Sequence, residues 1–327
     1  MEHKDLKQQK LANIRKKLGL FGALKLQDIE FIDLALTSKC NIRCALCQKT
    51  LVHKGKVPSI DIDIDVLKTK VFTRERTKQY KKVICCGSFG DPMVYKHIDE
   101  FIEHMVDVGP HLNLQFNTNG SMRNIEWWAK LGKKFRDIDY WVQFGLDGSS
   151  EETYKRYRVG GNFNKVMENM FAYVVNGGKA IWQFIIFDYN EHQVESTQEF
   201  CEALGIRFQP VMSYKYNEEF GRPKKYEIGY ELGSMNCRAI NEKSVYIDER
   251  GYLTPCCFSN LTNRLYYFDE RQIITSEDAK WLDLNISTME NAINSDFFKY
   301  IIQNHTCIKM CRFFCANQKR FEVVKRK

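Results

Sequence analysis

The chain has 327 residues, of which 44% are hydrophobic and 28% charged, and its formal net charge is +8 at pH 7. This length is enough to bury one large core and a smaller one, so we expect two folded domains. The longest apolar runs, such as 181–187, are too short to span a bilayer, and the first residues have no apolar signal region. We therefore expect a soluble, cytoplasmic protein with no membrane partner.

The positive charge gathers at the two ends of the chain. The basic residues there are Lys4, Lys7, Lys10, Arg15, Lys16, Lys17, Lys319, Arg320, Lys325, Arg326 and Lys327. Such ends can attract nucleic acid, an acidic peptide or a phosphorylated substrate, but solvated tails are the commoner case. No nucleic-acid-binding motif accompanies the charge, so a nucleic-acid partner is not expected.

Between residue 31 and about residue 210, short apolar runs alternate with helix-like stretches. The candidate strands are 31–37, 82–86, 112–118, 139–146, 180–187 and 206–209. This alternation predicts an α/β fold with a parallel sheet or barrel. Functional residues in such folds gather at the carboxyl ends of the strands.

Three cysteines, Cys40, Cys44 and Cys47, follow the first predicted strand as C-x-x-x-C-x-x-C. Twelve cysteines without a secretion signal favour reduced thiolates on metal over disulfides. A cubane iron-sulfur cluster normally takes four thiolates, so three can hold three irons and leave the fourth open. The alternative is a zinc site that borrows a fourth ligand such as His53, although zinc sites more often pair cysteines in two separate couples.

At these residues the sequence resembles the radical S-adenosylmethionine (SAM) superfamily, whose signature is this cysteine triplet. The resemblance implies a partial (β/α)6 TIM-like barrel and a catalytic 4Fe-4S cluster. It also implies that the open iron binds the amino and carboxylate groups of SAM, and that cluster reduction yields a 5′-deoxyadenosyl radical. Leu46 stands where the family usually has an aromatic residue, and we expect it to contact the adenine.

Further matches to the family follow the next two strands. Gly90 and Asp91 lie in a Gly-Ser-Phe-Gly-Asp-Pro segment that is similar to the family's Gly-Gly-Glu-Pro stretch, so Asp91 is expected to bind the SAM amino group. An isolated segment of this kind would be an ordinary turn. Asn117 and Asn119 end the third strand in a Thr-Asn-Gly sequence that the family shares, on the polar face of that strand.

The fourth strand ends similarly to the family's Ser-Ile-Asp-Gly sequence, with Gly145 in place of the usual serine. Gln143 and Asp147 on this strand are expected to line the mouth of the barrel, toward ribose or substrate. Ser149-x-x-Glu152 predicts a capping box at the start of the next helix. Arg158 after it matches the arginine that pairs with the SAM carboxylate, a role that suits a guanidinium.

A second group of cysteines begins at Cys237, and Cys256 follows in the pattern C-x13-G-x4-C. Gly251 in this pattern predicts a hairpin that brings the two together. The first half is similar to the opening of the Twitch and SPASM domains, which hold auxiliary 4Fe-4S clusters, and the Twitch form with one cluster fits better. The remaining ligands are expected among Cys307, Cys311 and Cys315, while Cys257 is a spare thiol, a ligand or a hydrogen-atom donor. Zinc at this site is the alternative.

Four segments are predicted. They are a basic N-terminal extension (1–24), a radical SAM partial barrel (25–210), a connecting segment (211–236) and a small cysteine-rich Twitch/SPASM-like domain (237–327).

We expect a radical SAM enzyme that abstracts a substrate hydrogen, most plausibly from a peptide or protein, with an auxiliary cluster and an external one-electron reductant such as flavodoxin or ferredoxin. The first alternative is a radical SAM dehydrogenase or epimerase acting on a small sugar or alcohol. The second is a noncatalytic zinc-bearing module that binds nucleic acid.

Overall fold

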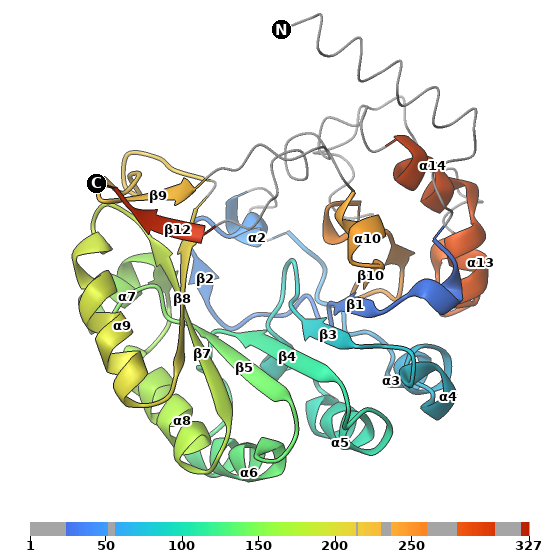
Figure 1. Ribbon diagram of the computed structural model, residues 1–327, viewed down its shortest axis with the longest axis horizontal. Helices are drawn as coiled ribbons and strands as arrows, with labels where there is room; N and C mark the ends of the chain where they lie inside the picture. The colour runs from blue at the N-terminus through green and yellow to red at the C-terminus, as the bar shows by residue number, and fades with distance from the viewer. Residues whose placement is uncertain are drawn as a thin grey trace, which may run out of the picture. The chain divides into compact units, whose positions relative to one another are not determined.

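Figure 1 shows the computed structural model of the chain, which describes residues 24–51, 56–213, 215–229, 237–259, 280–304 and 322–326. The contacts between residues divide the chain into two compact units. The first unit comprises residues 1–34, 62–82 and 230–320, and the second comprises residues 35–61, 83–229 and 321–327.

The second unit is built on a parallel sheet in the order β3-β4-β5-β7-β8. These strands are β3 (Lys82–Cys85), which enters the unit at Val83, β4 (Asn113–Thr118), β5 (Tyr140–Gly145), β7 (Lys179–Ile186) and β8 (Arg207–Met212). Parallel pairing joins β4 to β5, β5 to β7 and β7 to β8. The predicted parallel α/β architecture is confirmed.

Four amphipathic helices lie along the outer side of this sheet (Figure 1). They are α5 (Ile98–Val108), α6 (Ile125–Phe135), α8 (Phe163–Val175) and α9 (Val194–Ala203). Aromatic side chains fill the space between helices and strands, and the ring of Phe135 on α6 stacks on Phe116 of β4 at 6.1 Å. No helix in the described ranges is long and apolar enough to cross a membrane.

The first unit contains β1 (Phe31–Leu34), which pairs in parallel with β10 (Ser244–Ile247), and β11 (Leu253–Thr254), which pairs antiparallel with β10. Gly251 lies between the last two strands with a φ of 87°, which favours glycine, and the two strands form the predicted hairpin. The approach of Cys237 to Cys256 stays a prediction. The strand predicted at 31–37 is shorter in the structure, where β1 ends at Leu34 and belongs to the first unit.

The other described elements are short or lie outside these sheets. They are η1 (Leu26–Asp28), β2 (Arg43–Cys44), α2 (Gln48–Leu51), α3 (Ile64–Val66), η2 (Leu67–Val71), α4 (Arg74–Thr77), η3 (Pro92–Val94), α7 (Glu151–Tyr157), β6 (Arg158–Val159), η4 (Glu191–Gln193), β9 (Tyr226–Gly229), α10 (Arg238–Asn241), η5 (Cys257–Ser259), α13 (Met289–Asn294), α14 (Asp296–Asn304) and β12 (Glu322–Lys325).

The predicted capping box is displaced by one residue. Helix α7 has Ser150 as its N-cap, and the reciprocal partner is Thr153 rather than Glu152. Ser149 is engaged elsewhere, since its backbone N–H donates to Oε1 of Gln193 at 3.0 Å. The start of this helix is thus selected by a tertiary contact that the local pattern does not reveal.

Gly132 allows helices α6 and α8 to approach closely. A Cβ at this position would lie 2.2 Å from the carbonyl oxygen of Tyr173 on α8. We expect Gly132→Ala to lower the free energy of unfolding by about 1–3 kcal/mol through overpacking, although alanine is the better helix former. Denaturant unfolding measures this, with the exposed Lys133→Ala on the same helix as control. A more stable Gly132→Ala protein would contradict the close approach.

Candidate functional site

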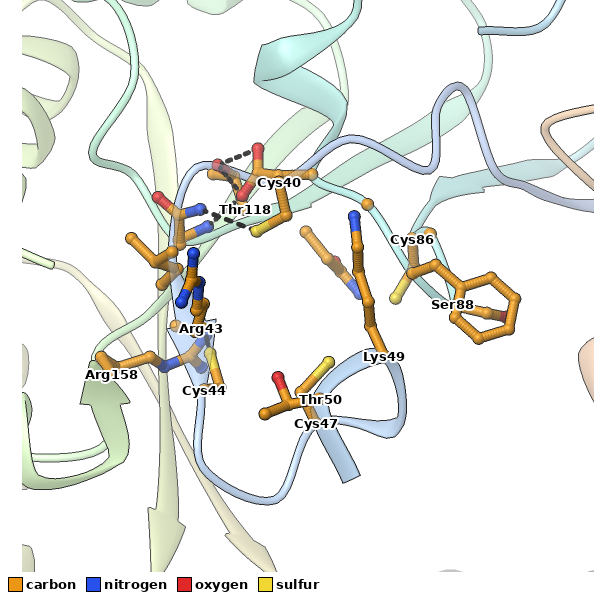
Figure 2. Close-up of a pocket in the computed structure, with 18 of the residues that line it drawn as sticks. Cys40, Arg43, Cys44, Cys47, Lys49, Thr50, Cys86, Ser88, Thr118 and Arg158 are labelled. Carbon is orange, nitrogen blue, oxygen red and sulfur yellow. Dashed lines mark hydrogen bonds between the residues drawn. The ribbon is translucent and has the colours of Figure 1, made fainter. Parts of the chain in front are cut away.

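A pocket of about 780 Å³ lies at the carboxyl ends of β3, β4 and β5, and all of its lining residues belong to the second unit (Figure 2). Eight of the predicted site residues line it: Cys40, Cys44, Cys47, Gly90, Asp91, Asn117, Asn119 and Arg158. Leu46, Gln143 and Asp147 are not among the lining residues. Segments from far apart in the sequence meet here because parallel strands bring their carboxyl ends to one edge.

The cysteine loop is held by backbone pairing. Strand β2, which ends at Cys44, pairs antiparallel with β6, so that Cys44 lies opposite Arg158. The N–H of Ala45 also donates to the carbonyl of Tyr157 at 2.9 Å. After Cys47 the loop becomes helix α2, whose residue Leu51 donates its N–H to the carbonyl of Cys47 at 2.8 Å.

The three thiols face one space, as Figure 2 shows. Burial raises the pKa of Cys40, and burial raises the pKa of Cys44 to about 12. A thiol binds a metal as its thiolate, so metal binding at Cys40 and Cys44 would release protons.

Two donors face the sulfur atoms. Nδ2 of Asn119 lies 3.7 Å from Sγ of Cys40, and Nη1 of Arg158 lies 3.5 Å from Sγ of Cys44. Within the described ranges, no three metal-binding side chains are gathered as a site for a single ion. Thiolates of a cubane cluster bind three different irons and so stand farther apart, and the donor set of soft sulfurs fits such a cluster.

Asp91 is a buried carboxylate at the pocket wall. It accepts hydrogen bonds from Oγ1 of Thr118 at 2.8 and 3.0 Å, from the N–H of Asn119 at 2.6 Å and from the N–H of Met93 at 2.9 Å. Burial raises the pKa of Asp91, and these donors act in the opposite direction. The carboxylate thus joins the loop after β3 to the end of β4.

Gly90 beside it is required by packing. A Cβ there would lie 1.9 Å from the carbonyl oxygen of Thr37 and would collide with backbone. The N–H of Asp91 donates to the carbonyl of Lys39 at 2.8 Å, one residue before the cysteine loop. Gly90 therefore permits the contact that sets the carboxylate close to Cys40.

Arg158 ends helix α7 and turns its side chain toward the pocket. Its Nε and Nη2 both contact Oδ2 of Asp147, at 2.7 and 2.6 Å. Asp147 is wholly buried, so its charge attracts the guanidinium strongly and holds the pKa of Arg158 above its ordinary value. Asp147 was expected to line the mouth of the barrel, but the structure places it beneath the pocket as the anchor of Arg158.

Leu46 also occupies a different place from the one expected. It packs in a buried cluster with Tyr157, Phe187 and Phe220 and does not line the pocket. The chain thus uses the position before the last cysteine to attach the loop to an aromatic core. The predicted adenine contact of Leu46 stays a prediction.

A ladder of polar side chains crosses the strands beneath the pocket. Nε2 of Gln115 donates to Asn117 at 2.6 Å and to Gln143 at 3.0 Å, and Gln143 donates to Gln183 at 2.8 Å. Gln143 is therefore a neighbour of the pocket through Asn117 and Gln183, which do line it.

Among the lining residues that were not predicted are three with long polar side chains, namely Gln183, Arg43 and Lys49. Gln183 is the one polar residue in the run 180–187, and that interruption of an apolar strand was the available signal. Arg43 and Lys49 lie within two residues of a predicted cysteine ligand, so the loop that carries the cysteines also carries them.

The predicted auxiliary site is only partly within the described residues. Cys237 is buried and Cys256 is half-buried, both in the first unit, and burial raises the pKa of Cys256. Cys307, Cys311 and Cys315 lie outside the described residues, as does His53. The auxiliary cluster therefore stays a prediction.

Thr118→Val should reveal the bond to Asp91. We expect the free energy of unfolding to fall by about 1–3 kcal/mol. Valine has nearly the shape of threonine but lacks the hydroxyl group that donates to the buried carboxylate. Burial raises the pKa of Asp91, and the loss of a donor to its carboxylate would raise that pKa further, so the loss of stability should be larger at pH 8 than at pH 5. Denaturant unfolding at both pH values measures it, with the exposed Thr69→Val as control. An equal loss at both pH values would count against the bond.

Comparison with known proteins places this geometry in a family. A probable GTP 3′,8-cyclase of Methanococcus maripaludis is 24% identical over 235 residues, which cover 68% of this chain and 74% of that protein. The structure of anSMEcpe with bound AdoMet has a TM-score of 0.58 at 12% identity and covers 88% of this chain and 84% of that chain. Streptococcus suis SuiB bound to precursor peptide SuiA has a TM-score of 0.54 at 13% identity, with coverage of 90% and 71%.

The family model described as the radical SAM superfamily matches residues 34–201. This match includes the cysteine triplet, Asp91 and Arg158. The chain belongs to the radical SAM superfamily.

Proposed function

We propose that Cys40, Cys44 and Cys47 hold a 4Fe-4S cluster whose fourth iron binds SAM. The observation that supports this most is that three thiols of one loop face a single pocket together with the buried carboxylate of Asp91 and the largely buried guanidinium of Arg158. When bound, the cluster supplies the electron that cleaves SAM to the 5′-deoxyadenosyl radical, which abstracts hydrogen from the substrate.

The residues around the thiols bind and orient SAM in this proposal. Asp91 accepts from the SAM amino group, because its carboxylate lies at the pocket wall and is already held by three donors. Arg158 uses N–H groups not directed at Asp147 or Cys44 to bind the SAM carboxylate. Asn117 and Asn119 lie at the end of β4 and offer amides to the ribose.

We propose a peptide or protein as the substrate. Arg43 and Lys49 line the pocket, and the acidic residue that lines it, Asp91, is assigned to the SAM amino group, so an anionic substrate group is favoured beside the two cations. Fold neighbours of this chain include a structure with a bound precursor peptide. An acidic side chain or leader of a peptide would meet these cations.

A second candidate substrate is GTP, since a relative named probable GTP 3′,8-cyclase matches 68% of this chain and a triphosphate would also meet Arg43 and Lys49. The small sugar or alcohol of the sequence-based alternative has no anionic group to match these cations.

The proposal also includes an external electron donor and an auxiliary cluster. A flavodoxin or ferredoxin would supply the electron as an external reductant in the cytoplasm. Cys237 and Cys256, with two thiols among Cys307, Cys311 and Cys315, would hold one auxiliary 4Fe-4S cluster that takes part in electron transfer or substrate binding.

Cluster ligation is tested by iron and sulfide analysis after anaerobic reconstitution. We expect each of Cys40→Ala, Cys44→Ala and Cys47→Ala to lose about four irons and to abolish reductive formation of 5′-deoxyadenosine from SAM. The control is Cys201→Ala, which removes a buried thiol on α9 far from the pocket lining. Zinc in the native protein, with no cluster after reconstitution, would overturn the proposal.

Substrate class is tested by the stimulation of 5′-deoxyadenosine formation. We expect acidic peptides to increase 5′-deoxyadenosine formation. Arg43→Gln should raise the half-saturating peptide concentration about tenfold while SAM binding is unchanged. The control is Lys155→Gln, an exposed cation of α7 that does not line the pocket. Stimulation by GTP and by no peptide would favour the second candidate.

A further inference from the structure

Gly145 stands where the resembling family usually has serine, and the structure shows what occupies the vacated space. A Cβ at Gly145 would lie 2.3 Å from Nη2 and 2.9 Å from Cζ of Arg158. The guanidinium therefore rests directly on the backbone at the end of β5. Any larger residue at this position would push the guanidinium away.

Asp147 then fixes the direction of the guanidinium. Nε and Nη2 both point at Oδ2 of Asp147, which leaves Nη1 on the opposite side. That side faces Cys44, and Nη1 lies 3.5 Å from its Sγ. The backbone pairing of Cys44 with Arg158 keeps the two residues in register, so the contact does not depend on a flexible loop.

From these contacts we propose that Arg158 tunes the redox potential of the cluster through an N–H···S bond to the Cys44 ligand, and that Gly145 exists to make room for it. Arg158 is thus a positioning and tuning residue in addition to any contact with SAM. The inference rests on the proposed ligation by Cys44.

The physical reason is electrostatic. Reduction adds one negative charge to the cluster, and a donor and positive charge at a ligand sulfur stabilise the reduced form more than the oxidised form. The bond is part-buried at the pocket wall, where water screens a charge-assisted hydrogen bond less than on an open surface. Loss of Nη1 should therefore make the cluster harder to reduce.

The test is an EPR-monitored redox titration of the reconstituted full chain without SAM. The signal that changes when SAM is added identifies the cluster in this pocket. We expect Arg158→Gln to shift the reduction equilibrium at least tenfold toward the oxidised form, which corresponds to about 59 mV for a one-electron couple. The control is Arg156→Gln, which removes a cation two residues earlier whose guanidinium packs on Tyr189 and donates to the carbonyl of Glu219.

A second variant keeps Arg158 in the protein. Gly145→Ala should displace the guanidinium and shift the potential in the same direction, and the double variant should shift it no further than Arg158→Gln alone.

If Arg158→Gln weakens SAM binding but leaves the SAM-free potential unchanged, the inference is wrong and Arg158 serves only SAM. If Arg156→Gln shifts the potential equally, the effect is general charge and the inference is also wrong. A native protein that forms no cluster would instead count against the proposed ligation.

Discussion

The carboxylate of Asp147 connects three segments around the pocket. It is wholly buried, its residue adopts a left-handed φ of 54°, and its Oδ1 accepts the N–H of Ile185 on β7 while Oδ2 holds Arg158. A buried carboxylate without a partner would destabilise the folded state, and the guanidinium of Arg158 supplies the opposite charge. Because Arg158 pairs through its backbone with Cys44, the position of the cysteine loop follows from this ion pair.

A second buried carboxylate, that of Asp91, is likewise held by donors from another segment of the pocket. Asp91 is buried near Cys40 and is held by Thr118 and Asn119 at the end of β4, while Gly90 packs against the backbone of Thr37. Polar groups at strand ends satisfy one another and leave the thiols facing the open space. Because these polar groups are fixed by one another, the side chains that line the pocket are held in place by the fold.

Local patterns predicted the strands well, because alternation of apolar and polar residues and the residues that end a strand are set by neighbours in sequence. The placement of Leu46 and the start of α7 were not predictable in this way. Leu46 packs with Phe187 and Phe220, and Ser149 bonds to Gln193, all of which are distant in the sequence. Such choices depend on which side chains meet after folding.

The sequence by itself determined the cysteine spacing, the order of strands and helices, and the polar residues at the strand ends, because each is a property of a short continuous segment. Only the tertiary structure decided that Asp147 holds Arg158 and that Arg158 faces Cys44, since these contacts form after folding and the guanidinium uses the room left by Gly145. The sequence shows that Gly145 stands in place of the family's usual serine, but only the structure shows that the guanidinium of Arg158 lies in the space beside it.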